Sequence, residues 1–108
     1  DIQYATYEDL CIRPDADYDA KIKDAKSHVC QKYFGIEIDC DAIANIPSSA
    51  ATPSGFSVLQ ARQFLTNFAE EKNVVYLHIC EAIPKKKTLE TVGKLYSYLI
   101  TDFMKARK

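Results

Sequence analysis

The chain has 108 residues, of which 47% are hydrophobic and 27% are charged, and its formal net charge is −1. These values indicate one soluble globular unit without the basic excess that nucleic-acid binding requires. No apolar run is long enough to span a membrane and no signal-peptide pattern is present, so we expect a cytoplasmic protein. The four cysteines contain no C-x-x-C pair, which favours reduced thiols over a disulfide framework or a zinc site.

Residues 1–16 carry no clear secondary-structure signal, and we assign them no function. The first predicted element is a helix that begins at Asp17. Its apolar face contains Tyr18, Ile22, Ala25 and Val29, while lysines occupy the other faces. His28 lies near the end of this helix, where a solvated histidine is more common than a metal ligand.

The second predicted element is a buried strand that runs from Phe34 to Asp41 and ends in two acids. Since side chains alternate along a strand, Asp39 and Asp41 are predicted to lie on the same face. Ligands of α/β sheets collect beyond the carboxyl ends of the strands, so this pair is a candidate metal site. The alternative is that one Asp caps a turn or the following helix while the other is solvated.

A long loop rich in proline and hydroxyl residues follows, over residues 42–56. Loops of this length are uncommon in compact domains and are usually functional, so we expect this one to form a wall of a pocket. Ser57 and Gln60 then form a capping-box pattern. They predict a helix that continues to about Lys72.

A second apolar run covers residues 74–80, ends in Glu81 and predicts another strand. His78 is on the opposite face from Glu81, so we expect it to contact a packed helix rather than a metal. The basic run of Lys85, Lys86 and Lys87 stays unassigned, with a solvated loop as its default explanation and anion binding as the alternative. Thr88 is predicted to cap a final helix. The apolar face of that helix contains Val92, Leu95, Leu99 and Phe103.

Two strands joined by a helix predict a parallel β–α–β unit, and hence an α/β fold in which helices cover both faces of a parallel sheet. Asp39, Asp41 and Glu81 would then emerge at the same edge of the sheet. Carboxylates that cluster without a charge partner are costly, and a divalent cation or a cationic substrate such as a guanidinium relieves that cost. The sequence therefore predicts a pocket that receives positive charge.

Three segments of the chain carry a family resemblance: Ile38-Asp39-Cys40-Asp41-Ala42-Ile43, the Pro-Ser-Ser-Ala-Ala-Thr-Pro-Ser-Gly loop, and Leu77-His78-Ile79-Cys80-Glu81-Ala82-Ile83-Pro84. Together they resemble the C-terminal part of the ureohydrolase superfamily, which contains arginase, agmatinase and formimidoylglutamase. The resemblance extends from about Tyr33 to Phe103. Residues 52–56, 91–94 and 101–103 look most like the formimidoylglutamase branch.

The resemblance implies a three-layer arginase-like domain, of which residues 1–108 are a C-terminal portion. It implies that the parent protein uses manganese to hydrolyse a C–N bond of a linear amidine or guanidine. Asp39 and Asp41 would be ligands of two Mn²⁺ ions that lower the pKa of a shared water, and Glu81 would bind the cationic group of the substrate. The implied partners are this small cationic substrate and the missing N-terminal part of the domain. Whether the protein forms a homo-oligomer is left open.

The chain also departs from the superfamily pattern. Asn45 and Pro47 stand where arginases have a tight Asp-Pro, which weakens the case for arginine as substrate. The upstream His and Asp-x-His-x-Asp ligands have no counterpart, so we expect residues 1–108 alone to bind manganese weakly and to be inactive. The competing hypothesis is a non-catalytic α/β module with an acidic rim that binds a divalent cation or a partner. A nucleotide-sugar transferase would also use Asp-x-Asp, but it offers no role for Glu81.

Overall fold

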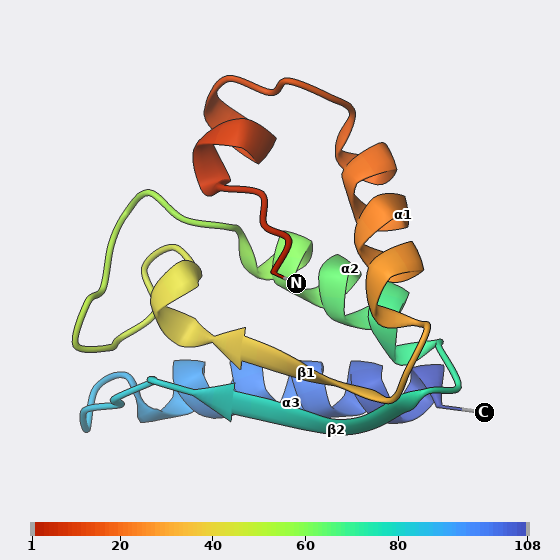
Figure 1. The fold of residues 1–108 in the computed structure, drawn as a ribbon. Helices are drawn as coiled ribbons and strands as arrows, with labels where there is room; N and C mark the ends of the chain where they lie inside the picture. The colour runs from red at the N-terminus through yellow and green to blue at the C-terminus, as the bar shows by residue number, and fades with distance from the viewer. Residues whose placement is uncertain (1, 108) are drawn as a thin grey trace.

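The computed structural model describes residues 2–107 as a small mixed α/β unit (Figure 1). A single π-helical turn, η1, covers Glu8–Ile12 in the N-terminal segment. The three α-helices are α1 (Tyr18–Val29), α2 (Val58–Ala69) and α3 (Leu89–Ala106). The two strands are β1 (Phe34–Asp39) and β2 (Val74–Cys80), and a short 3-10 turn, η2 (Cys40–Ala42), follows β1. No helix among the described residues is long and apolar enough to cross a membrane.

The two strands form a parallel sheet, as the sequence predicts, and α2 lies in the connection between them. Ile36 pairs with Leu77 and Ile38 pairs with Ile79, so these four apolar side chains share one face. That face packs into one core with α2 and α3, and Figure 1 shows α3 behind β2. Leu65 of α2 and Leu99 of α3 are completely buried there. Burial of this apolar surface is the main force that holds the helices to the sheet.

The opposite face of the sheet is exposed within residues 2–107. Glu37 and Asp39 of β1 and His78 of β2 point to this side and are exposed. The predicted helices on both faces are therefore seen on one face only, where α2 and α3 lie. The sequence of β1 explains why only one face is buried. Its polar residues alternate with its isoleucines, so only one side of the strand is apolar.

Four predicted boundaries or roles differ from the structure. α2 ends at Ala69 and does not continue to about Lys72. β1 ends at Asp39 instead of Asp41, because the backbone turns into η2. His78 does not contact a packed helix, since its side chain is 56% exposed on the open face. Thr88 does hold the N-cap position of α3, but its hydroxyl accepts a hydrogen bond from the Lys85 N–H instead of capping the helix.

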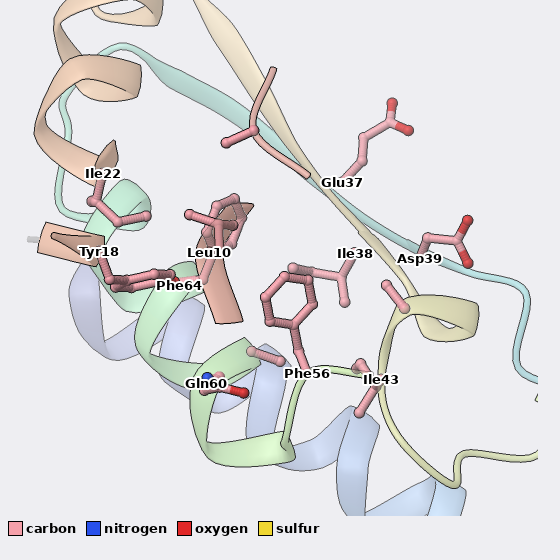
Figure 2. Close-up of a pocket in the computed structure, with 13 residues that line it drawn as sticks. Leu10, Tyr18, Ile22, Glu37, Ile38, Asp39, Ile43, Phe56, Gln60 and Phe64 are labelled. Carbon is pink, nitrogen blue, oxygen red and sulfur yellow. The ribbon is translucent and has the colours of Figure 1, made fainter. Parts of the chain in front are cut away.

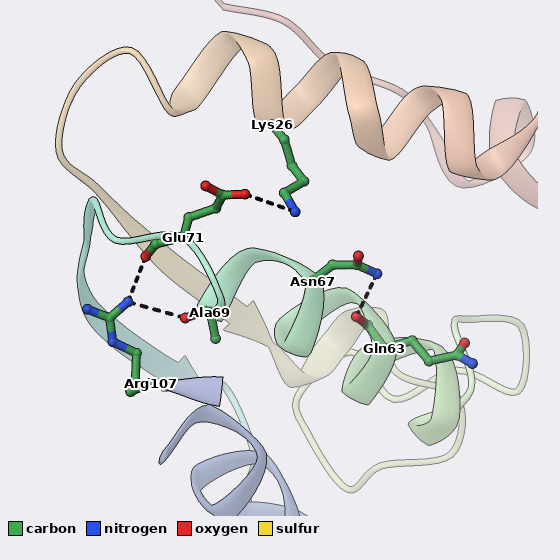
Figure 3. A network of polar contacts seen from close by, with 6 residues as sticks. All are labelled: Lys26, Gln63, Asn67, Ala69, Glu71 and Arg107. Atoms are coloured by element: carbon green, nitrogen blue, oxygen red, sulfur yellow. Dashed lines mark hydrogen bonds and ion pairs between the residues drawn. The ribbon is translucent and has the colours of Figure 1, made fainter. Parts of the chain in front are cut away.

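Charged side chains form contacts between the ends of the helices (Figure 3). Lys26 of α1 forms an ion pair with Glu71, 3.0 Å away, just after α2. Arg107 donates hydrogen bonds from Nη1 to the carbonyl oxygens of Ala69 and Glu71, at 3.2 and 2.7 Å. These carbonyls lie at the C-terminal end of α2, where a cation is favourable because the helix dipole places partial negative charge there.

Candidate functional site at the carboxyl end of the sheet

Asp39 is the last residue of β1 and organises the turn that follows it. Its Oδ1 accepts a hydrogen bond from the Asp41 N–H at 2.9 Å, which closes the η2 turn. An Asp that bonds the backbone two residues later is a standard way to end a strand. One Asp therefore caps a turn, which is the alternative that the sequence left open. The two acids do not continue one strand face, but both remain at the carboxyl end of β1.

The loop after η2 connects the ends of the two strands. Ala50 donates its N–H to Oδ1 of Asp41 at 3.3 Å, and Ile83 donates its N–H to the carbonyl of Pro47 at 2.8 Å. Ser48 forms an isolated antiparallel bridge with Ala82, the residue after Glu81. The loop is therefore held on both the Asp41 side and the Glu81 side. The two ends of the loop, at Ala42, Ile43 and Phe56, line an apolar cavity beside β1, which agrees with the expectation that the loop forms a wall of a pocket.

Glu81 follows β2 directly and has a left-handed backbone conformation, with φ of 72°. Such a conformation costs a residue with a Cβ roughly 1–2 kcal/mol, and glycine would adopt it freely. In the sheet, Asp39 is the register partner of Cys80. Glu81 is thus one residue beyond the strand position opposite Asp39, and the carboxyl ends of the two strands lie at the same edge.

The thiol of Cys80, the last residue of β2, lies near acidic residues of both strand ends. Burial is the largest cause that raises the pKa of the Cys80 thiol, and the negative charges of neighbouring carboxylates raise that pKa further. Those carboxylates belong to Asp39, Glu81, Glu37 and Asp41. Burial also raises the pKa of the neighbouring Cys40 thiol, whose residue is completely buried. Both cysteines are free thiols, as expected from their spacing.

These residues do not complete a metal site by themselves. Among residues 2–107, no three His, Cys, Asp or Glu side chains are arranged so that they could hold a metal ion. One oxygen of Asp39 and one of Asp41 already accept backbone hydrogen bonds. His78 lies on the open face near Glu37, with its Nδ1 3.7 Å from that carboxylate, and His28 lies in α1. Carboxylates are suitable ligands for Mn²⁺, but a transition ion usually needs further donors, imidazoles above all.

An apolar cavity lies beside β1 (Figure 2). Its volume is about 260 Å³. Its walls include Leu10, Ile22, Ile38, Phe56 and Phe64, which come from the N-terminal segment, α1, β1, the long loop and α2. Figure 2 shows the carboxylates of Glu37 and Asp39 pointing away from this cavity. Glu37 and Asp39 nevertheless line the cavity, so the cavity borders the acidic edge of β1.

Tyr76 lies at the centre of the open face, and the sequence patterns did not point to it. Tyr76 donates its hydroxyl to Oε1 of Glu37 at 3.1 Å, and this contact raises the pKa of Tyr76. The ring of Tyr76 lies over Gly35, where a Cβ would come within about 2 Å of the ring carbons. The available signal was the glycine inside a strand, which often marks the close approach of another group.

Lys85, Lys86 and Lys87 are exposed and stay unassigned.

Comparison with known proteins adds no family assignment: no protein-family model matches the chain, and no curated protein matches it.

Proposed function

We propose that this chain is the C-terminal portion of a manganese-dependent hydrolase that cleaves a C–N bond of a linear amidine or guanidine, as formimidoylglutamase and arginase do. Asp39 and Asp41 contribute ligands to two Mn²⁺ ions in the intact site, and Glu81 binds the cationic group of the substrate. The remainder of the domain supplies the other ligands and completes a three-layer fold. The proposal rests on the sequence resemblance together with the geometry at the carboxyl edge of the sheet.

The observation that carries the proposal is the left-handed backbone of Glu81 at this edge. A strained residue at a position where glycine would be relaxed is a recognised sign that the side chain is kept for function. Asp39 is opposite the residue before Glu81, so a ligand at the edge can meet carboxylates from both strands. A carboxylate binds a planar amidinium or guanidinium through paired charge-assisted hydrogen bonds.

The residues present fit part of such a centre. Asp39 and Asp41 each accept one backbone hydrogen bond through Oδ1, and the hydrogen bonds found in residues 2–107 do not engage Oδ2 of either acid. The metal ions would supply Lewis acidity to the reaction when bound. The chain's own role is then to hold metal with two carboxylates and to orient the substrate with Glu81, which is positioning and not proton transfer.

The first test measures Mn²⁺ binding to residues 1–108 by isothermal titration calorimetry. We expect weak binding that is lost in the double variant Asp39→Asn/Asp41→Asn and retained in Asp24→Asn, which removes an exposed carboxylate from α1. No amidine hydrolysis is expected from this chain alone, because the donor set is incomplete. Release of ammonia, urea or formamide by the purified 108-residue chain would refute this division of roles.

The second test uses a longer polypeptide that includes the rest of the domain. Comparison of urea, ammonia and formamide release identifies the substrate class. In that protein, Glu81→Gln is expected to lower kcat/KM by about ten- to a hundredfold, the range for loss of a charge-assisted hydrogen bond. Unchanged kcat/KM in this variant would remove Glu81 from the substrate site and with it the main support for the proposal.

The second candidate function is a non-catalytic module whose acidic rim binds a divalent cation or a partner. It is favoured by the incomplete donor set within residues 2–107 and by the backbone hydrogen bonds that Asp39 and Asp41 already accept. The two candidates differ in the longer polypeptide. A module of this kind would bind a cation there without any hydrolysis, whereas the proposed hydrolase would turn over an amidine.

A further inference from the structure

The N-terminal segment, residues 2–16, is separated from the core by unfilled space. The apolar cavity of about 260 Å³ lies between this segment and β1, and a neighbouring hollow has a volume of about 350 Å³. Ala5, Leu10, Ile22 and Phe64 line both spaces. Protein interiors contain few voids larger than a water molecule, so an apolar space of this size is characteristic of a ligand site.

The walls of the 260 Å³ cavity come from five segments of this chain. They include Leu10 of the N-terminal segment, Ile22 of α1, Ile38 of β1, Phe56 of the long loop and Phe64 of α2 (Figure 2). The cavity is too small for a helix, which with its side chains is about 10 Å across. A strand from the missing part of the domain would have to displace the N-terminal segment. A small molecule fits as the walls stand, since apolar cavities of about 150 Å³ already accept benzene.

The walls favour an uncharged ligand. The carboxylates of Glu37 and Asp39 point away from the cavity (Figure 2), so they offer no opposite charge to a cation inside it. Gln60 lines the α2 side, and both ends of its amide are engaged: Oε1 accepts from the Ser57 N–H at 2.8 Å, and Nε2 donates to Sγ of Cys11 at 4.0 Å. A charged ligand would lose its hydration here without compensation, whereas a neutral apolar ligand gains from burial.

The N-terminal segment can open to admit such a molecule. None of residues 2–16 is buried, so opening of the segment costs little free energy. Its main attachment is Tyr7, whose hydroxyl donates to the carbonyl of Gly55 at 3.2 Å and whose ring packs edge-on against Phe56. A molecule in the cavity would contact Ala5 and Leu10 and would thereby hold the segment closed.

We propose that this cavity binds a small neutral apolar molecule, about the size of a bicyclic aromatic ring, and that the bound ligand fixes the N-terminal segment onto β1 and α2. The site is compatible with the proposed metal ligands, because the Asp39 carboxylate points away from the cavity. It does not depend on the hydrolase activity. The ligand would also contact Ala42 and Ile43, which lie at the end of the η2 turn between the two acids and the long loop.

The test is an NMR titration of the ¹⁵N-labelled 108-residue chain with indole, a neutral bicyclic aromatic molecule. We expect a dissociation constant of roughly 0.1–1 mM, as for small apolar ligands in preformed cavities. Amide shifts are expected at Ile38, Phe56 and Phe64 and not on the outer side of α3. At an indole concentration of about ten times the dissociation constant, hydrogen exchange of residues 5–12 should slow by about tenfold, since only the closed segment binds. Indole-3-carboxylate, which adds a negative charge to the same ring, should bind at least about tenfold more weakly.

Two variants alter the walls of the cavity from different elements. Ala61→Leu fills the cavity from α2, and Leu10→Ala removes an apolar wall from the N-terminal segment. Each should weaken the affinity for indole by about fivefold or more. Leu10 lies outside the buried core, so its variant keeps the fold even if Ala61→Leu does not. Gly93→Ala is the control: a Cβ at this position in α3 meets nothing within 4 Å, and the affinity should be unchanged.

The proposal is overturned if indole does not bind, if indole-3-carboxylate binds equally well, if the shifts lie only on α3, or if Leu10→Ala leaves the affinity unchanged. Indole is also expected to bind the longer polypeptide. Loss of binding there would show that the rest of the domain fills the cavity or displaces the N-terminal segment, and it would likewise overturn the proposal. Absence of amidine hydrolysis in the longer polypeptide would remove the proposed function and leave the ligand site standing.

Discussion

At the scale of single residues, two positions have a strained backbone conformation. Asn45 and Glu81 are the non-glycine residues with positive φ within residues 2–107, at 61° and 72°. Asn tolerates the left-handed region because its short polar side chain bonds locally, whereas Glu has no such advantage. The strained backbone at Glu81 costs stability but keeps a carboxylate at the edge of the sheet. This agrees with the role that we propose for Glu81.

Replacement of Glu81 by glycine is therefore expected to stabilise the chain. Glu81→Gly should raise the free energy of unfolding by about 1 kcal/mol, because relief of the left-handed strain exceeds the added flexibility of glycine in the unfolded chain. Asn45→Gly is the matched control and should change it by only a few tenths of a kcal/mol, about the cost that Asn bears in this region. Urea denaturation measures both. Equal changes in the two variants would show that Glu81 carries no special strain.

Gly35 in β1 and Gly93 in α3 give a second comparison. A Cβ at Gly35 would come within 2.0 Å of the Tyr76 ring, whereas a Cβ at Gly93 in α3 meets nothing within 4 Å. Gly35→Ala should lower the free energy of unfolding by about 1–2 kcal/mol and displace the Tyr76 ring. Gly93→Ala should raise it by about 0.5–1 kcal/mol, since alanine is the better helix former. Urea denaturation with near-ultraviolet circular dichroism checks both; stabilisation by Gly35→Ala would contradict the packing of Tyr76.

At the scale of the elements, one charged contact fixes α3 against α2. Arg62 of α2 donates from Nε and Nη2 to the two carboxylate oxygens of Asp102 in α3, at 2.6 and 3.0 Å. The Asp102 side chain is only 14% exposed, and the guanidinium also lies over the Tyr98 ring at 4.9 Å. A two-point contact of this kind fixes both the distance and the rotation of α3 on α2.

Loss of this contact should be visible in the pH dependence of stability. The hydrogen bonds from Arg62 lower the pKa of Asp102, so the contact stabilises the folded state above the unfolded pKa of about 3.9 and its contribution is lost as the pH falls below that value. Asp102→Asn should cost about 1–2 kcal/mol at pH 7 and flatten the stability curve between about pH 2 and 4. Denaturant titrations at several pH values measure this. An unchanged slope in Asp102→Asn would assign the acid sensitivity to other carboxylates, such as Glu71 beside Lys26.

The whole molecule is built from a tightly packed part and a loosely attached N-terminal segment. The packed part comprises the sheet, α2 and α3, which supply most of the buried core residues. The N-terminal segment has few buried side chains, and its main attachment is Tyr7, which donates to the carbonyl of Gly55 at 3.2 Å and packs edge-on against Phe56. Segments with few buried contacts open at low free energy.

Hydrogen exchange should separate these two parts. Amides of residues 4–12 are expected to exchange with protection close to that of free peptide, while amides of β1, β2 and α2 exchange only through larger openings. Tyr7→Ala should abolish the remaining protection of the segment and lower the global free energy of unfolding by less than about 1 kcal/mol. Strong protection of residues 8–12 in the variant would show that the π-helical turn is stable without the Tyr7 contact.

The sequence by itself determined the parallel α/β order of elements and the placement of the acids at strand ends. The alternation of Ile36 and Ile38 with polar residues, the capping box at Ser57 and the apolar stripe of α3 are local patterns, and local patterns specify local structure. The boundary errors arose where a local hydrogen bond competes with the strand pattern. Asp39 bonds the Asp41 N–H, and this ends β1 two residues before the predicted end.

Only the tertiary structure decided which face of the sheet is covered, how the long loop closes on Asp41 and Ala82, and that Glu81 is left-handed. Strand periodicity separates two faces, but it does not say which of them a helix will bury, and His78 was misplaced for that reason. The loop bonds depend on partners about 10 to 40 residues away in the sequence. Such contacts become defined only when the packed sheet brings distant segments together.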